Sequence, residues 1–244
     1  MNYVQVRGST QTSTGTVLPP VFAGSLVPGF KGATIGACAR VAFGPADAIS
    51  NVSGHALLAL PTEACVFPST LTAPTVWPAT DQIIMLQDTA GCGGFGWMTN
   101  PSPSAGCTTT VNYLANVSMN FTNTITTACM TAISNAQARP SSPANTSYIL
   151  LPIYSSLSHS GGTPHVTLAG VAAFVITGYR LGTGFGQTQQ SWLSGKNSCG
   201  TGGGSSPRCL FGYFVGPVSM VDVNAKAGTT TQPNFGVNVF QTVG

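Results

Sequence analysis

The stretch VTLAGVAAFVITGYRLGTGFG, residues 166–186, decides the fold class of this chain. Its opening run, VTLAGVAAFVITGY, is rich in Val, Ile, Phe and Thr and contains an internal glycine. A membrane-spanning helix needs about 18–20 uninterrupted apolar residues, and no run in the sequence reaches that length. β-branched and aromatic residues in a run this short favour a strand. The stretch therefore predicts buried β structure.

Similar strand-like runs recur along the whole chain, separated by residues typical of turns. They cover residues 2–11, 33–44, 81–88, 147–157, 208–223 and 234–243. One helix is expected over residues 124–138, where Ile125, Cys129, Met130 and Ile133 recur at helical spacing. Residues 46–60 fit either a short helix or the approach to a strand. We expect a mainly β, mostly antiparallel fold, either sandwich-like or α+β with one or two short helices, forming a single domain over residues 1–244.

Charge is scarce in this sequence. Charged residues make up 5% of the chain, and eight Lys and Arg against five Asp and Glu give a net charge of +3. An average soluble domain has about 25% charged residues, so this surface must be built from uncharged polar side chains. A nucleic-acid-binding protein needs a clustered basic surface, which the sequence lacks. We therefore expect no nucleic-acid partner.

The seven cysteines predict disulfides formed outside the cytoplasm, because their spacing fits neither a zinc site nor a redox motif. Cys199 and Cys209 flank a short Gly/Ser loop, and a disulfide between them would hold the strand beginning at Cys209 in register. Two further pairs are expected, Cys107 with Cys129 and Cys65 with Cys92. The alternative is that all seven are reduced and buried.

The remaining cysteine, Cys38, lies in the alternating run ATIGACARVAFG. Alternation places it on the inward face of a strand. We expect a buried free thiol at this position.

Catalytic chemistry has little support in the sequence. The five carboxylates form no close pair, and no nucleophile elbow or phosphate-binding loop is present. His159 is expected to be a solvated turn residue, and His165 a hydrogen-bonded turn or edge residue. We predict no catalytic residue, no metal site, no cofactor and no enzymatic activity. A glycine-rich loop carrying Phe95, Trp97 and Met98 is a candidate binding loop, because exposed aromatic rings can stack on a ligand.

The order of the segments resembles the extracellular region of bacterial TadE/TadG-like proteins of the tight-adherence (Flp) pilus-assembly group. The similar motifs are GGFGW, LLPIYS, HVTLAGVAAFVITGYR and the cysteine-bounded loop leading into CLFGYF, at residues 93–97, 150–155, 165–180 and 199–214. The early ATIGACARVAFGP run is similar as well, with Phe43 in place of a tryptophan. Ser155 replaces the acidic residue of the family motif, and the tail beyond Met220 is longer.

This resemblance implies a non-catalytic structural or assembly protein of a bacterial surface pilus, a minor pilin or pseudopilin-like head. Its location would be extracellular, on the outer side of the cytoplasmic membrane. Its partners would be other pilus or envelope subunits, or further copies of itself. The apolar N-terminal helix of the family is not among these 244 residues, so membrane attachment is expected only through such an anchor. The alternatives are an adhesin-like module that binds glycan or protein through the aromatic loop, and a secreted hydrolase.

Overall fold

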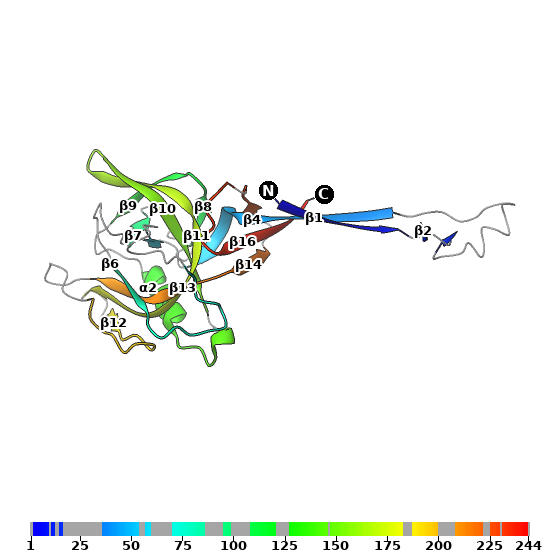
Figure 1. Cartoon of the computed structure of the whole chain (residues 1–244). Helices are drawn as coiled ribbons and strands as arrows, with labels where there is room; N and C mark the ends of the chain where they lie inside the picture. The colour runs from blue at the N-terminus through cyan, green and yellow to red at the C-terminus, as the bar shows by residue number, and fades with distance from the viewer. Residues whose placement is uncertain are drawn as a thin grey trace.

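A computed structural model of the protein shows a β-rich body from which one pair of strands extends (Figure 1). The described part of the chain forms a six-stranded sheet, an eight-stranded sheet, a small two-stranded hairpin and one α-helix. The described residues are 2–9, 11–12, 15–16, 36–53, 57–59, 70–85, 95–98, 108–120, 127–145, 147–182, 187–199, 208–221, 225–229 and 231–243. The mainly β, antiparallel fold class expected from the sequence is confirmed.

The eight-stranded sheet is built around one long strand, β11. Its members are β5 (Leu57–Ala59), β6 (Gln82–Met85), β7 (Phe95–Met98), β9 (Asn116–Asn120), β10 (Ile149–Ser160), β11 (Thr163–Gly182), β12 (Gln187–Gln189) and β13 (Cys209–Val215). β10 and β11 form an antiparallel hairpin, and its turn residues Gly161 and Gly162 have φ angles of 58° and 84°. Glycine adopts this left-handed region without a steric penalty.

Five of these strands close into a ring. From β10 the successive neighbours are β5, β7, β9 and β11, and β11 pairs with β10 again. β5 and β10 are parallel, and the other pairs in the ring are antiparallel. Beyond the ring β11 pairs with β12 on the edge shared with β10, and with β13 on the edge shared with β9. β6 then lines the outer edge of β13.

The second sheet is organised by β4, which is 18 residues long. Its members are β1 (Asn2–Ser9), β4 (Gly36–Ser53), β8 (Thr108–Asn112), β14 (Val218–Val221), β15 (Lys226–Ala227) and β16 (Val237–Val243). β1 and β16 pair with opposite edges of the first part of β4, and β8 and β15 with its second part. β14 runs parallel to β16. The small hairpin consists of β2 (Gln11–Thr12) and β3 (Gly15–Thr16).

The two faces of β11 contact different cores, which explains its continuous apolar sequence. Val171, Ala173 and Val175 belong to the hydrophobic cluster shared with the second sheet. Phe174 and Ile176 point the other way, into the cluster shared with the helix. A strand that is covered on both faces needs apolar residues at every position rather than at alternate ones. The prediction of a buried strand in this stretch is confirmed.

The helix α2 (Thr127–Gln137) lies within the predicted range 124–138, and the short 3-10 helix η2 (Pro143–Asn145) follows it. The buried residues of α2 are Cys129, Met130 and Ile133, which the helical spacing had indicated. Their side chains belong to the same cluster as Phe174. Among the described residues no helix is both long and apolar enough to cross a membrane.

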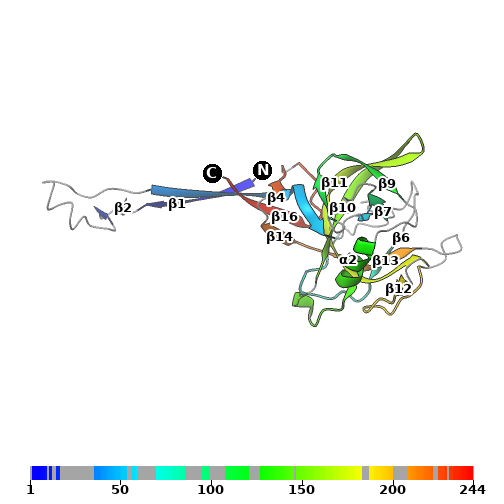
Figure 2. The ribbon, with the colours of Figure 1, turned by 180° about the vertical axis from the view of Figure 1, so that it is seen from behind.

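β1 and the first part of β4 extend away from the body, as the two opposite views agree (Figures 1 and 2). We call β1 together with residues 36–43 of β4 the ribbon. All of residues 36–40 are exposed, so the prediction that Cys38 is buried is wrong, although the thiol is free. At residues 36–40 neither face of the strand is covered by the described residues, so alternation there does not indicate burial.

Candidate functional site

The ribbon is exposed along most of its length. Seven of the eight residues of β1 are exposed and one is partly buried. Its large apolar side chains Tyr3, Val4 and Val6 have 64%, 56% and 65% of their surface exposed. Soluble proteins seldom leave apolar side chains side by side in water, and such a surface marks an interaction site.

One face of the ribbon is apolar and the other is mixed. Opposite residues of an antiparallel pair share a face, and Val4 lies opposite Val41 while Val6 lies opposite Ala39. At the centre of the ribbon, this face consists of the apolar side chains Val4, Val6, Ala39 and Val41. On the other face Gln5 lies opposite Arg40, and Tyr3, Arg7, Cys38 and Ala42 complete it.

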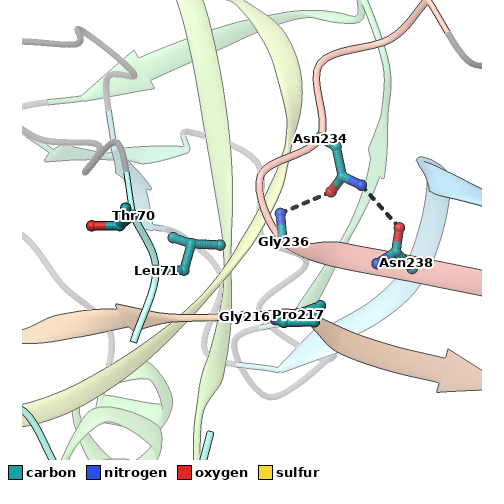
Figure 3. A pocket seen from close by; sticks show the side chains of 7 residues that line it. All are labelled: Thr70, Leu71, Gly216, Pro217, Asn234, Gly236 and Asn238. Carbon is teal, nitrogen blue, oxygen red and sulfur yellow. Dashed lines mark hydrogen bonds between the residues drawn. The ribbon is translucent and has the colours of Figure 1, made fainter. Parts of the chain in front are cut away.

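A surface groove with a volume of about 490 Å³ lies where β13 passes into β14 and where β16 begins (Figure 3). The groove is lined by Thr70, Leu71, Gly216, Pro217, Asn234, Gly236 and Asn238. Asn234 organises its polar rim by accepting a hydrogen bond from the Gly236 N–H at 2.8 Å and donating one to Asn238 at 3.0 Å. The peptide bond between Gly216 and Pro217 is cis.

Glycine at position 236 is required at the base of this groove. A Cβ on Gly236 would lie 2.3 Å from the Leu71 side chain, and one on Gly216 would lie 2.5 Å from it. Gly236 also has a φ of 89°, which residues with a side chain rarely adopt. The lining has amide, hydroxyl and apolar groups but no acid, base or thiol. The groove therefore supplies hydrogen-bonding and apolar groups to its surface and no group for acid–base or thiol chemistry.

A buried carboxylate joins three segments that are far apart in the sequence. Asp81, just before β6, accepts a hydrogen bond from the Thr177 hydroxyl at 2.7 Å and another from the Ser191 hydroxyl. The Asp81 side chain is fully buried, and its second oxygen lies 3.8 Å from Lys196 Nζ. Gln137 at the end of α2 donates to the Thr177 carbonyl at 3.0 Å and attaches the helix to the same point.

The Asp81 cluster holds the fold together and is not arranged for chemistry. The Ser191 hydroxyl also accepts the N–H groups of Leu193 and Ser194, at 3.2 and 3.1 Å, which closes a local turn. A serine nucleophile needs an adjacent base that can take its proton. Here the Ser191 oxygen accepts hydrogen bonds from two backbone N–H groups, and its hydroxyl donates to Asp81, whose side chain is fully buried. We interpret the cluster as structural.

His165 lies on β11 with its Nδ1 atom 3.3 Å from the Ser118 hydroxyl. Such a pair becomes a nucleophile and base only when a third group orients the imidazole ring. Of the two described carboxylates, Asp81 binds Thr177 and Ser191, and Asp47 binds Gln232 and Lys226. Among the described residues no three His, Cys, Asp or Glu side chains gather to hold a metal ion.

The aromatic binding loop expected from the sequence is a buried strand. Trp97 and Met98 belong to β7 and are each 5% exposed, so neither side chain can stack on an external ligand. The prediction of an exposed aromatic loop is wrong at these two positions. The reason is that β7 lies between β5 and β9 within the ring, and Trp97 packs in the cluster that contains Ile133 and Phe174. Phe95 is in the same strand, and its side chain is outside the described set.

The disulfide between Cys199 and Cys209 is confirmed, with the two Cα atoms 5.7 Å apart. It packs against Phe211 in a small cluster of its own. Desolvation by burial lowers the pKa of the neighbouring Arg208 guanidinium from its ordinary value. Cys129 is also disulfide-bonded.

Cys65, Cys92 and Cys107 lie outside the described residues, as does His55. The pairs Cys107–Cys129 and Cys65–Cys92 therefore stay predictions. No protein-family model matches this chain, and neither does any curated protein or solved structure that it was compared with. Its function must be inferred from the residues and their arrangement.

Proposed function

We propose that this protein is the head of a non-catalytic structural or assembly subunit of a bacterial surface pilus, acting on the outer side of the cytoplasmic membrane. The observation that carries the proposal is the ribbon, an exposed β-strand pair that extends from a disulfide-linked β body. A subunit of a filament or of its assembly apparatus needs a rigid body and a surface committed to neighbouring subunits. The ribbon and the body supply those two parts.

The position of the family-like motifs supports the same proposal. The segments that resemble the TadE/TadG-like motifs contribute β7, β10, β11 and β13, which all belong to the eight-stranded sheet. The resemblance therefore covers the structural centre of the body. Low charge also suits a subunit role, since surfaces with few charges can approach each other without long-range repulsion.

The extracellular location is supported by the disulfide chemistry. Cys199 and Cys209 are bonded and buried, and disulfides persist in oxidising compartments. The location is tested by isolating the protein from its native source under alkylating conditions and counting free thiols after unfolding without reductant. One reactive thiol, at Cys38, is expected. A count of seven would contradict an extracytoplasmic location.

Deletion of the gene in the source bacterium tests the pilus function. We expect fewer pili by electron microscopy and weaker surface attachment, both restored by the wild-type gene. Unchanged pilus number and unchanged attachment would refute the proposal. The adhesin alternative required an exposed aromatic loop, and the burial of Trp97 and Met98 removes that platform. We therefore propose no second function.

A further inference from the structure

The outer edge of β1 is an open template for another strand. β1 pairs with β4 without interruption from Asn2 opposite Phe43 to Ser9 opposite Gly36, and in the described part of the chain it pairs with no other strand. Natural proteins protect such edges with charged residues, proline or bulges. β1 contains no proline, its register has no bulge, and Arg7 is its only charged residue.

β14, at the opposite end of the strand order β1-β4-β16-β14, offers a poorer template. β14 has four residues against the eight of β1, and its burial alternates in the way expected for a strand with one covered face. Edge pairing gains its affinity from the number of backbone hydrogen bonds that form along the strand. β1 is therefore a better site for strand addition than β14.

The sequence of β1 is complementary to itself in one antiparallel register. When a two-fold axis passes through Gln5, Val4 of each copy lies opposite Val6 of the other, and Tyr3 lies opposite Arg7. The valines then form cross-strand apolar pairs, and each Arg7 guanidinium can lie over a Tyr3 ring. The same patch serves both copies, as a two-fold interface requires.

The positions of the charged side chains also favour the antiparallel register over the parallel one. Parallel in-register pairing would place Arg7 beside its own copy, and like charges directly opposite each other are unfavourable. In the antiparallel register the two Arg7 side chains are four residues apart, or about 14 Å. The two Arg40 side chains are three strand spacings apart, also about 14 Å. These separations exceed the screening length of about 10 Å at moderate salt.

We propose that two copies of this chain pair through the outer edges of β1, antiparallel about an axis through Gln5, so that the two ribbons form one continuous sheet. The apolar face of each ribbon then joins that of its partner, because Val4 and Val6 lie at the junction and Val41 lies behind Val4. The inference rests on the proposed function for its biological meaning, since it names the partner as a second subunit. Its physical content is tested on the purified chain alone.

Cysteine cross-linking tests the register. In the full chain with Cys38→Ser, which removes the exposed free thiol, Gln5→Cys places one thiol on the proposed axis. Opposite residues in an antiparallel pair have Cα atoms about 4.5–5.5 Å apart, within the disulfide range of about 4.4–6.8 Å. We expect a disulfide-linked dimer under mild oxidation.

Val4→Cys and Val6→Cys in the same background are the matched controls. Each would lie about 8 Å from its own copy in this register and should not cross-link alone. A mixture of the two should give the heterodimer, because each faces the other. Cross-linking of the single Val4 or Val6 variants as efficient as that of Gln5→Cys would overturn the register.

Sedimentation of the unmodified chain tests whether the association exists. We expect a monomer–dimer equilibrium that Val6→Lys weakens about tenfold, because the substitution puts a cation in place of a cross-strand apolar pair. Val221→Lys on β14 is the matched control, since Val221 is 87% exposed and lies on the other edge, and it should leave the equilibrium unchanged. Circular dichroism should show the wild-type fold for both variants.

A chain that remains monomeric at high concentration and forms no Gln5→Cys dimer would overturn the self-pairing. The proposed pilus function would still be tested by the gene deletion. Conversely, unchanged pili after gene deletion would refute the pilus function whatever the oligomeric state. An equal effect of Val6→Lys and Val221→Lys would also overturn the self-pairing, because it would place the interface elsewhere.

Discussion

Removing the buried carboxylate of Asp81 should destabilise the protein strongly. The Asp81 side chain is fully buried and accepts hydrogen bonds from the hydroxyls of Thr177 and Ser191. A hydrogen bond to a charged group contributes about 1.5–3 kcal/mol. Asp81→Ala removes two of these, after which one of the two hydroxyls, whose oxygens are 3.0 Å apart, can donate to the other. We expect the free energy of unfolding to fall by about 3 kcal/mol or more.

Two further substitutions separate the hydrogen bonds from the ion pair. Asp81→Asn keeps an acceptor oxygen but removes the charge, so each of the two bonds weakens to the neutral strength of about 1 kcal/mol. The free energy of unfolding should then fall by about 1–4 kcal/mol. Lys196 is 43% exposed and its Nζ atom is 3.8 Å from the carboxylate, so water screens this pair. Lys196→Met should therefore lower the free energy of unfolding by less than about 1 kcal/mol.

The assay is urea unfolding followed by tryptophan fluorescence, with the free energy extrapolated to zero denaturant. Asp47→Asn is the control, because Asp47 also binds a lysine, at 3.1 Å, and accepts a bond from Gln232, but its side chain is 26% exposed. Asp47→Asn should lower the free energy of unfolding by about 1 kcal/mol or less. A smaller effect for Asp81→Ala than for Asp47→Asn, or an effect of Lys196→Met larger than that of Asp81→Asn, would refute the reasoning.

Three other predictions concern the body. Replacing Cys199 and Cys209 together by serine should lower the free energy of unfolding by about 2.7 kcal/mol in the chain-entropy model for a separation of 10 residues, and equal stability of the oxidised and reduced wild-type protein would contradict it. Gly212→Ala should lower the free energy of unfolding by about 3 kcal/mol or more, because its Cβ would lie 2.1 Å from a backbone carbonyl oxygen of β11. Gly8→Ala is the control, because the space around Gly8 is open, and this variant should unfold at the same urea concentration as the wild type. Trp97→Ala should lower the free energy of unfolding by about 3–5 kcal/mol because of the cavity that the substitution leaves. A variant with wild-type stability would argue that the Trp97 ring is not in the core.

Local pattern was enough to predict much of the body. The apolar run that became β11 is too short for a membrane helix and too rich in β-branched residues for a surface helix, so its sequence leaves a buried strand as the interpretation. The helical spacing of Cys129, Met130 and Ile133 identified the buried side of α2. The Cys199–Cys209 bond followed from two cysteines around a flexible loop.

The candidate site was harder to predict. The alternating sequence of β1 signalled a strand with Val4 and Val6 on one face, but it did not indicate that this face is exposed. The Asp81 cluster had only one weak signal, a threonine at position 177 within an apolar run. Its three members are brought together by pairings between residues that are distant in the chain.

The sequence by itself determined the longest strands and the helix, which side chains share a face, and one covalent bond, because these depend on backbone preference and on spacing along the chain. Only the tertiary structure decided which faces are covered. Cys38 and Trp97 both lie in strands, yet the first is exposed on the ribbon and the second is buried within the ring of strands. Burial depends on which distant element lies across from a face, and that is a property of the whole fold.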